Sequence, residues 1–189
     1  MADHFDSGVT MLKPAANNPA TRPALTDALV ASVKAKATTT LTLLNNASIE
    51  FGANNVTFAN SLGAEDMVLT DIILKSALNI EIFSLDTGRL PVETYDLMSA
   101  TEKHYNTKLN VYFPHADAVE TYVKLNGINA FYESIDLRKA CCHMRKVEPL
   151  QRALKNKAAW ITGMRATQAT TRASLPVREF DTANQLEKL

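Results

Sequence analysis

Residues 56–90 read VTFANSLGAEDMVLTDIILKSALNIEIFSLDTGRL, and this stretch decides the fold. Short apolar runs at Val56–Asn60 and Ile80–Leu85 are typical of buried strands. Between them, apolar residues recur at helical spacing over Ala64–Leu78. A strand, a helix and a second strand in this order predict two neighbouring parallel strands joined by a crossover helix.

The same alternation continues on both sides of this unit. It predicts an α/β fold in which helices cover both faces of a parallel sheet. Residues 1–22 show no periodicity, so we expect a flexible N-terminal arm followed by a single domain over residues 23–189. Threonines between positions 38 and 42 weaken the second half of the first predicted helix. The further predicted strands are Leu109–Phe113 and Ala158–Thr162, and the further helices are about 25–44, Pro91–Tyr105, Ala116–Leu125 (ended by Gly127) and Arg145–Leu154.

Composition excludes several classes of protein. The 20 Lys and Arg residues balance 20 Asp and Glu residues, which argues against electrostatic binding of nucleic acid. Hydrophobic residues make up 46% and charged residues 21%, as in ordinary globular domains, so disorder of the whole chain is excluded. We find neither an apolar run of about 18 residues, as a membrane helix needs, nor an apolar signal core at the N-terminus.

The sequence has two cysteines, Cys141 and Cys142, which are adjacent. Neighbouring Cα atoms are about 3.8 Å apart, below the range of about 4.4–6.8 Å found in disulfides. A bridge between the two would therefore be strained, and we expect reduced thiols in a cytoplasmic protein.

Ligands of open α/β sheets bind beyond the carboxyl ends of the strands. The first such place is the loop Ser61–Asp66, SLGAED, where Gly63 favours a tight turn and the following helix offers free N–H groups to an anion. No Lys follows this glycine, so the loop is not a Walker A motif. The alternative is an ordinary strand–helix turn capped by Ser61.

A second such place follows the strand that ends at Leu85. There Asp86, Thr87 and Gly88 set a carboxylate, a hydroxyl and a mobile backbone at the sheet edge, or else form only a local Asx turn. A third is Gly163–Arg172, where Arg165 and Arg172 could bind sulfate or phosphate oxygens unless the loop is merely solvated.

The cysteine pair is the fourth place, within RKACCHMRK, residues 138–146. The basic side chains around it favour thiolates and attract anions. Inert buried cysteines remain an alternative. The spacing is a poor match to a zinc site, and an iron–sulfur cluster would need four thiolates where the chain has two.

Four segments in this order resemble the assimilatory adenylyl-sulfate and phosphoadenylyl-sulfate reductases. The resemblance runs from about Val56 to Asp181, and its most specific parts are the CC-x-x-R-K-V-x-P-L run and the W-I-T-G-x-R segment. The four are SLGAED (61–66), LDTGRL (85–90), KACCHMRKVEPLQRAL (139–154) and WITGMRATQATTRASLPVREFD (160–181).

The resemblance implies an adenine-nucleotide α-hydrolase-like (PP-loop) fold, close to the ATP pyrophosphatases. Those enzymes carry a fuller S-G-G-x-D-S loop, whereas SLGAED fits a site that holds a sulfonucleotide without cleaving ATP. The modified loop contributes Ser61 and Gly63. The resemblance also implies further substrate-binding residues. These are Leu85, Asp86, Thr87 and Gly88 against the adenosine, Lys146, Arg165 and Arg172 facing the phosphosulfate, and Gly163.

Members with an adjacent Cys-Cys pair resemble the type that holds a [4Fe–4S] cluster and prefers adenylyl sulfate, so Cys141 and Cys142 are implied as two of its ligands. The implied reaction converts adenylyl sulfate (or phosphoadenylyl sulfate) to sulfite and AMP in sulfate assimilation and cysteine biosynthesis. A mobile C-terminal cysteine attacks sulfur and becomes a thiosulfonate, from which thioredoxin or glutaredoxin releases sulfite. The resemblance is also compatible with a homo-oligomer.

The family pattern continues with a Cys-x-x-Cys and a terminal cysteine motif that bears the nucleophile, and this chain ends at Leu189 with neither. We therefore expect no catalytic residue within these 189 residues and interpret them as the N-terminal part of a reductase. Two other hypotheses are a non-catalytic nucleotide-binding remnant and a relative of the ATP pyrophosphatases, such as the sulfate adenylyltransferase small subunit.

Overall fold

A computed structural model describes residues 25–164 and 176–189. The chain divides into two compact units, residues 1–35 and 36–189. The described part of the first unit is residues 25–35, which contain the start of helix α1 (Asp27–Phe51). The second unit contains the rest of that helix and every strand described below.

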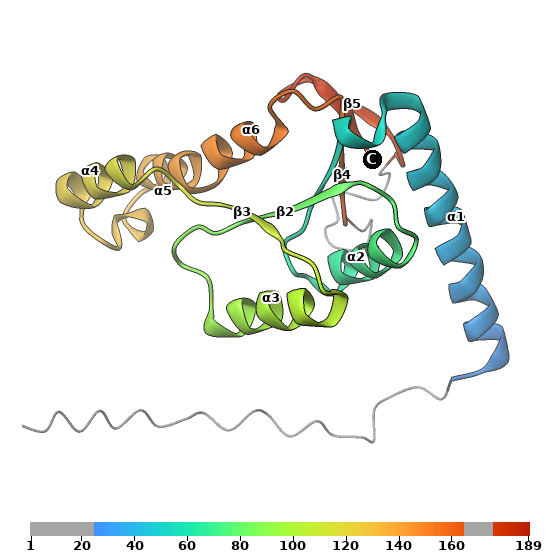
Figure 1. The fold of residues 1–189 in the computed structure, drawn as a ribbon. Helices are drawn as coiled ribbons and strands as arrows, with labels where there is room; N and C mark the ends of the chain where they lie inside the picture. Colours follow the sequence, from blue (N-terminus) through green and yellow to red (C-terminus); the bar gives the residue numbers. More distant parts are fainter. Residues whose placement is uncertain (1–24, 165–175) are drawn as a thin grey trace, which may run out of the picture. The chain divides into compact units, whose positions relative to one another are not determined.

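The described strands form one six-stranded sheet in the order β3-β2-β1-β4-β6-β5 (Figure 1). Neighbouring strands are parallel except β5 and β6, which form an antiparallel pair at one edge. Ala59 of β1 aligns with Phe83 of β2 and Thr162 of β4, so the loops after these three strands leave the sheet at the same edge. The bounds are β1 Val56–Ala59, β2 Glu81–Leu85, β3 Asn110–Tyr112, β4 Ala159–Thr162, β5 Glu179–Asp181 and β6 Leu186–Lys188.

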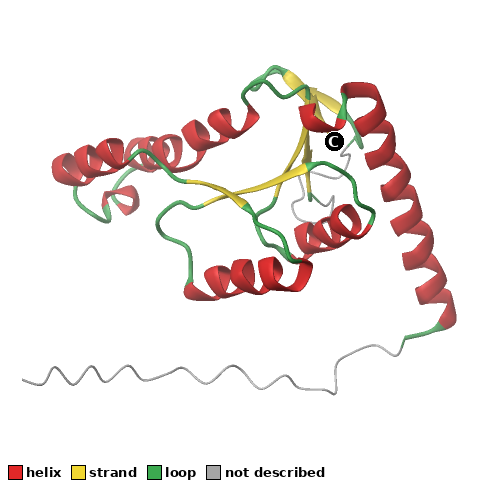
Figure 2. Cartoon of the chain, viewed as in Figure 1, coloured by secondary structure: helices red, strands yellow, loops and turns green. Residues whose placement is uncertain are grey.

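Helices connect the strands, as Figure 2 shows in red. A long helical run leads into β4: α5 continues through a π-helical segment, η4, directly into α6. The other helices are α2 (Ala64–Lys75), α3 (Val92–Tyr105) and α4 (Ala116–Asn126), with short 3-10 turns η2 (Ala53–Asn55) and η3 (Ala130–Tyr132). The long run consists of α5 (Ile135–Cys142), η4 (His143–Val147) and α6 (Glu148–Leu154).

Two apolar clusters cover the two faces of the sheet, because side chains alternate between the faces along each strand. The larger cluster contains Val56 and Phe58 of β1 and packs against residues of α1, α2 and α3. The smaller one contains Phe83 of β2 and packs against Ala153 and Leu154 of α6. This confirms the predicted α/β fold with helices on both faces of a mostly parallel sheet.

Several predicted boundaries are wrong for physical reasons. The first helix does not stop at residue 44 but runs to Phe51, because burial of Leu44 and Ala47 outweighs the low helix propensity of the threonines. The helix predicted to begin at Arg145 is the end of the run that begins at Ile135. The β5–β6 hairpin was not predicted. No helix among the described residues has the length and apolar character needed to cross a membrane.

Candidate functional site

The loop after β1 is organised by a carboxylate of the same segment. Asp66, in the first turn of α2, is 4% exposed, and its Oδ2 accepts hydrogen bonds from the Ser61 backbone N–H at 2.7 Å and from Ser61 Oγ at 2.5 Å. Gly63 N–H in turn donates weakly to Ser61 Oγ, at 3.4 Å. Asp66 therefore occupies both donor groups of Ser61.

The tight turn in this loop does not depend on Gly63. Gly63 precedes α2 with φ −65° and ψ 159°, which any residue can adopt, whereas Leu62 has φ 64°. The Leu62 N–H donates to Asn60 Oδ1 at 2.6 Å, and Asn60 is itself held by Thr70 of α2. The expectation that Gly63 provides the turn is therefore wrong, and side-chain hydrogen bonds around Leu62 hold the strained residue instead.

Gly163, directly after β4, contacts the same carboxylate. A Cβ atom at this position would lie 1.9 Å from Asp66 Oδ1 and 3.3 Å from the Asp66 backbone nitrogen. Glycine is therefore required here because the backbone approaches α2 closely. Through Asp66, the structure brings together two sequence-predicted segments that are about a hundred positions apart.

The turn after β2 is held by Asp86, which is 4% exposed. Its Oδ1 accepts from the Gly88 backbone N–H at 2.7 Å and from the Tyr95 hydroxyl of α3 at 3.1 Å. The hydrogen bond to Asp86 raises the pKa of Tyr95, because a phenolate beside that carboxylate would be repelled. Gly88 has φ 69°, so this glycine does supply a left-handed conformation.

Arg145, in the π-helical segment η4, reaches the same turn. Its side chain is buried, and Nη1 donates to the Thr87 carbonyl at 2.5 Å. A Cβ atom on Gly88 would lie 3.2 Å from this Nη1. The helical run that carries the cysteine pair is therefore joined directly to the turn after β2.

The cysteine pair lies at the end of α5, with Cys141 buried and Cys142 exposed. Consecutive residues of an α-helix differ by about 100° in direction, which explains the different environments of the two thiols. The described residues contain no group of three or more His, Cys, Asp or Glu side chains that could hold a metal ion. A four-thiolate cluster therefore does not fit the residues of this chain alone, which has two cysteines.

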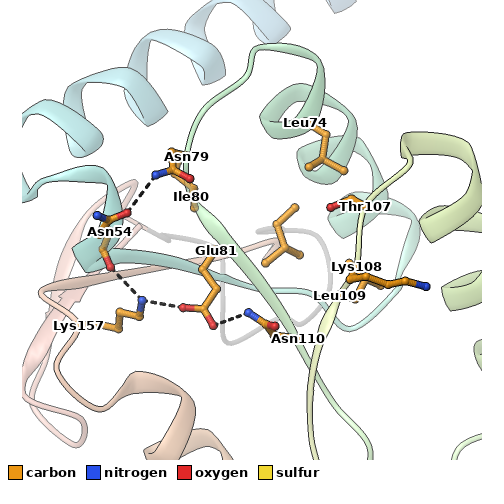
Figure 3. A pocket seen from close by; sticks show the side chains of 11 residues that line it. Asn54, Leu74, Asn79, Ile80, Glu81, Thr107, Lys108, Leu109, Asn110 and Lys157 are labelled. Atoms are coloured by element: carbon orange, nitrogen blue, oxygen red, sulfur yellow. Dashed lines mark hydrogen bonds and ion pairs between the residues drawn. The ribbon is translucent and has the colours of Figure 1, made fainter.

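A pocket of about 380 Å³ lies at the opposite edge of the sheet, beside the amino ends of β2 and β3 (Figure 3). Its polar groups bond to one another: Lys157 Nζ lies 2.7 Å from Glu81 Oε2 and 2.9 Å from the Asn54 carbonyl. Asn110 Nδ2 donates to Glu81 Oε1 at 2.8 Å. This network links the residues just before β1 and β4 to the first residues of β2 and β3, so we assign it a structural role.

The structure places the predicted residues that it describes in two groups at the carboxyl edge. In one group the Ser61 loop and Gly163 meet at Asp66; in the other the 86–88 turn contacts the helical run through Arg145. Leu85 is half-buried at the end of β2, and Lys146 is exposed beside Arg145. Arg165 and Arg172 lie outside the described residues. Sequence reasoning did not assign roles to Asp66 and Arg145. Both stand inside recognised motifs. Asp66 bonds to Ser61 within its own motif, whereas Arg145 contacts Thr87 across the fold and leaves no local pattern.

Comparison with known proteins adds independent information. The family described as the phosphoadenosine phosphosulfate reductase domain matches residues 55–188. The chain is 55% identical over 136 residues to an adenosine 5'-phosphosulfate reductase of Allochromatium vinosum, covering 72% of this chain and 53% of that protein. It is 50% identical over 135 residues to the one of Burkholderia cepacia, covering 71% and 54%. The chain thus spans about half the length of the curated relatives it matches.

A solved structure has a similar fold. The phosphoadenylyl-sulfate reductase of Candida auris, in a phosphate complex, superimposes with a TM-score of 0.64 over 89% of this chain and 80% of that one. The sequences are 24% identical, so this similarity concerns the fold alone.

Proposed function

The chain belongs to the phosphoadenosine phosphosulfate reductase domain family, and from this we propose that it forms the sulfonucleotide-binding part of an adenylyl-sulfate reductase. The observation that carries the proposal is the convergence of its motifs. Asp66 joins the Ser61 loop to Gly163, and Arg145 joins the cysteine-bearing helix to Thr87. The names of the similar proteins favour adenylyl sulfate as the substrate.

In this proposal the adenosine lies against the turn formed by Asp86, Thr87 and Gly88, beside Leu85. The backbone of Gly163 approaches from β4, and the phosphosulfate faces Lys146, Arg165 and Arg172. Because Asp66 already occupies both donors of Ser61, these two groups are not available to a pyrophosphate. This arrangement supports binding of a nucleotide monophosphate derivative rather than cleavage of ATP.

The reaction proposed for the complete protein transfers two electrons. A cysteine thiolate attacks the sulfate sulfur, the bond between that sulfur and the phosphate oxygen breaks, and AMP leaves with the bonding pair. Thioredoxin, or glutaredoxin, then attacks the thiosulfonate with one thiol and releases sulfite. Its second thiol resolves the mixed disulfide, so the dithiol is oxidised and the sulfonyl group is reduced. The nucleophile must come from outside these 189 residues, whose two cysteines form the adjacent pair.

We propose that Cys141 and Cys142 provide two ligands to a [4Fe–4S] cluster when two further thiolates are supplied by other polypeptide. When bound, such a cluster would place a strong local charge near the substrate. Two free thiols in the chain are consistent with a cytoplasmic location in sulfate assimilation.

Calorimetric titration of the chain with AMP, adenylyl sulfate and ATP tests the proposal. We expect AMP and adenylyl sulfate to bind. ATP should bind at least about tenfold more weakly, because Asp66 already occupies the Ser61 donors in the loop after β1. Absence of binding by both AMP and adenylyl sulfate would refute the proposal. Pyrophosphate release from ATP would instead favour a relative of the ATP pyrophosphatases.

A sulfite-release assay with thioredoxin addresses the hypothesis of a non-catalytic remnant. Sulfite production by the 189-residue chain would exclude that hypothesis. It would also show that a nucleophile is present after all.

A further inference from the structure

Arg145 is a buried cation whose role the motifs do not assign. Its side chain is 8% exposed, and Nη1 donates to a backbone carbonyl, that of Thr87. Its Nε is buried and has no hydrogen-bond partner among the described residues. Because removing a guanidinium from water is costly, such burial calls for a specific reason.

That reason lies in the backbone of the 86–88 turn. Nη1 lies so close to Gly88 that a Cβ there would be 3.2 Å away. The other side of the turn is fixed by Asp86, which accepts from the Gly88 N–H and from the hydroxyl of Tyr95. The turn is thus fixed at two successive residues, Asp86 by the helix α3 that follows it and Thr87 by η4, 58 positions further along the chain.

The π-helical segment puts Arg145 in this position. π-helical turns are rare, occur as single-turn bulges inside α-helices, and are frequent at functional sites. In η4 the residue beside it, Lys146, is exposed, whereas Arg145 points into the fold against the turn.

We propose that Arg145 is a positioning residue that holds the Thr87 carbonyl, and with it the 86–88 turn, in the conformation that receives the nucleoside of the ligand. This inference rests on the proposed function, because the turn is taken to contact adenosine. Acting through the backbone of the turn, Arg145 affects recognition of the nucleoside and not of the phosphate. Loss of the Arg145 side chain should therefore weaken the binding of adenosine and the binding of AMP by the same factor.

Calorimetry with adenosine and AMP on the 189-residue chain tests this. Arg145→Met should weaken both ligands equally, by about tenfold, the typical effect of one lost charge-assisted hydrogen bond. Arg145→Lys retains a donor for the Thr87 carbonyl and should weaken both by only about threefold. Lys124→Met removes an exposed cation of α4 and should leave both affinities unchanged.

Amide hydrogen exchange of the ligand-free chain gives a second readout. Exchange at residues 86–89 should become faster in Arg145→Met, while the strands keep their protection. If Arg145→Met does not fold, Arg145→Lys carries the test, and unchanged affinities for both ligands in it overturn the proposal.

The outcomes separate this inference from the proposed function. Loss of AMP affinity with adenosine unchanged in Arg145→Met would mean a direct contact with the phosphate and would overturn the positioning role. Wild-type affinities in that variant would do the same. Failure of the unmodified chain to bind either ligand would refute the proposed function, and this inference with it.

Discussion

Gly163→Ala should destabilise the fold through a single contact. The added methyl carbon would lie 1.9 Å from Asp66 Oδ1 and 3.0 Å from its Cγ. The carboxylate would have to retreat by about 1.5 Å, from 1.9 Å to the 3.4 Å at which ordinary contact begins. Such a movement would break the bonds of 2.7 and 2.5 Å that Asp66 accepts from Ser61.

The magnitude follows from these two responses. If the carboxylate stays, overpacking costs about 1–3 kcal/mol. If it moves, the lost charge-assisted hydrogen bonds cost about 1.5–3 kcal/mol each. Because the structure will adopt the less costly response, we expect the free energy of unfolding of Gly163→Ala to fall by about 2–3 kcal/mol in urea titrations.

Two comparisons isolate the contact. Gly63→Ala adds a methyl group whose nearest neighbour is 3.4 Å away, at a compatible φ, so its stability should be unchanged or about 0.5 kcal/mol higher. In an Asp66→Ala background the methyl group at position 163 has room, and its penalty should fall to about 0.5 kcal/mol or less. An equal penalty in both backgrounds, or a Gly163→Ala variant as stable as the unmodified chain, would refute the reasoning.

Three other predictions concern stability. Tyr105→Phe removes the 2.6 Å hydrogen bond to Asp71 and should cost about 1 kcal/mol at neutral pH. Burial, aided by that bond, raises the pKa of Tyr105 to about 12, so its stabilisation is complete below pH 10 and is lost as the pH rises toward 12. Between pH 10 and 12 the free energy of unfolding should therefore fall less steeply for Tyr105→Phe than for the unmodified chain. Parallel curves of this free energy against pH would contradict the assignment. Lys157→Met leaves Glu81 without its cation in a partly buried network and should cost about 1–2 kcal/mol, whereas no loss would mean that the network is not stabilising. Arg178→Lys gives up one of the two hydrogen bonds to the Glu50 carboxylate and should lower the melting temperature. In about 1 M salt the melting temperature of this variant should approach that of the unmodified chain, because salt screens the charges. A difference that does not depend on salt would argue against an electrostatic cause.

The parts of the fold that could be predicted from sequence are those built from local patterns. Val56–Ala59 and Glu81–Leu85 are strands buried in a parallel sheet, and such strands read as continuous apolar runs. The helix Ile135–Cys142 lies outside the predicted helices, and most of its residues are exposed, with Cys141 buried. Its start is fixed by the Ser134 hydroxyl, which accepts from the Leu137 N–H at 3.1 Å.

The candidate site was predictable as four segments but not as a set of contacts. Motif resemblance marks Ser61, Thr87 and Gly163, because each lies within a segment of unusual composition. It does not show that Asp66, five positions on, fills the donors of Ser61. Nor does it show that Arg145 binds the Thr87 carbonyl, since these two partners lie 58 positions apart and leave no periodic signal. The β5–β6 hairpin escaped prediction for a related reason, because its three-residue strands are largely charged and pair through the backbone.

The π-helical segment at residues 143–147 also bears on how this helix can diverge. A π turn holds one residue more than the α turn it replaces, so deletion of a single residue here would restore a regular helix. Because the π turn already accommodates the extra residue, the helix on either side would keep its phase, and the change would fall on the side chains of the turn itself. Arg145 would then no longer lie where its Nη1 meets the Thr87 carbonyl, although its own codon had not changed. In sequence alignments, a one-residue gap at this position should therefore matter more than most substitutions around it.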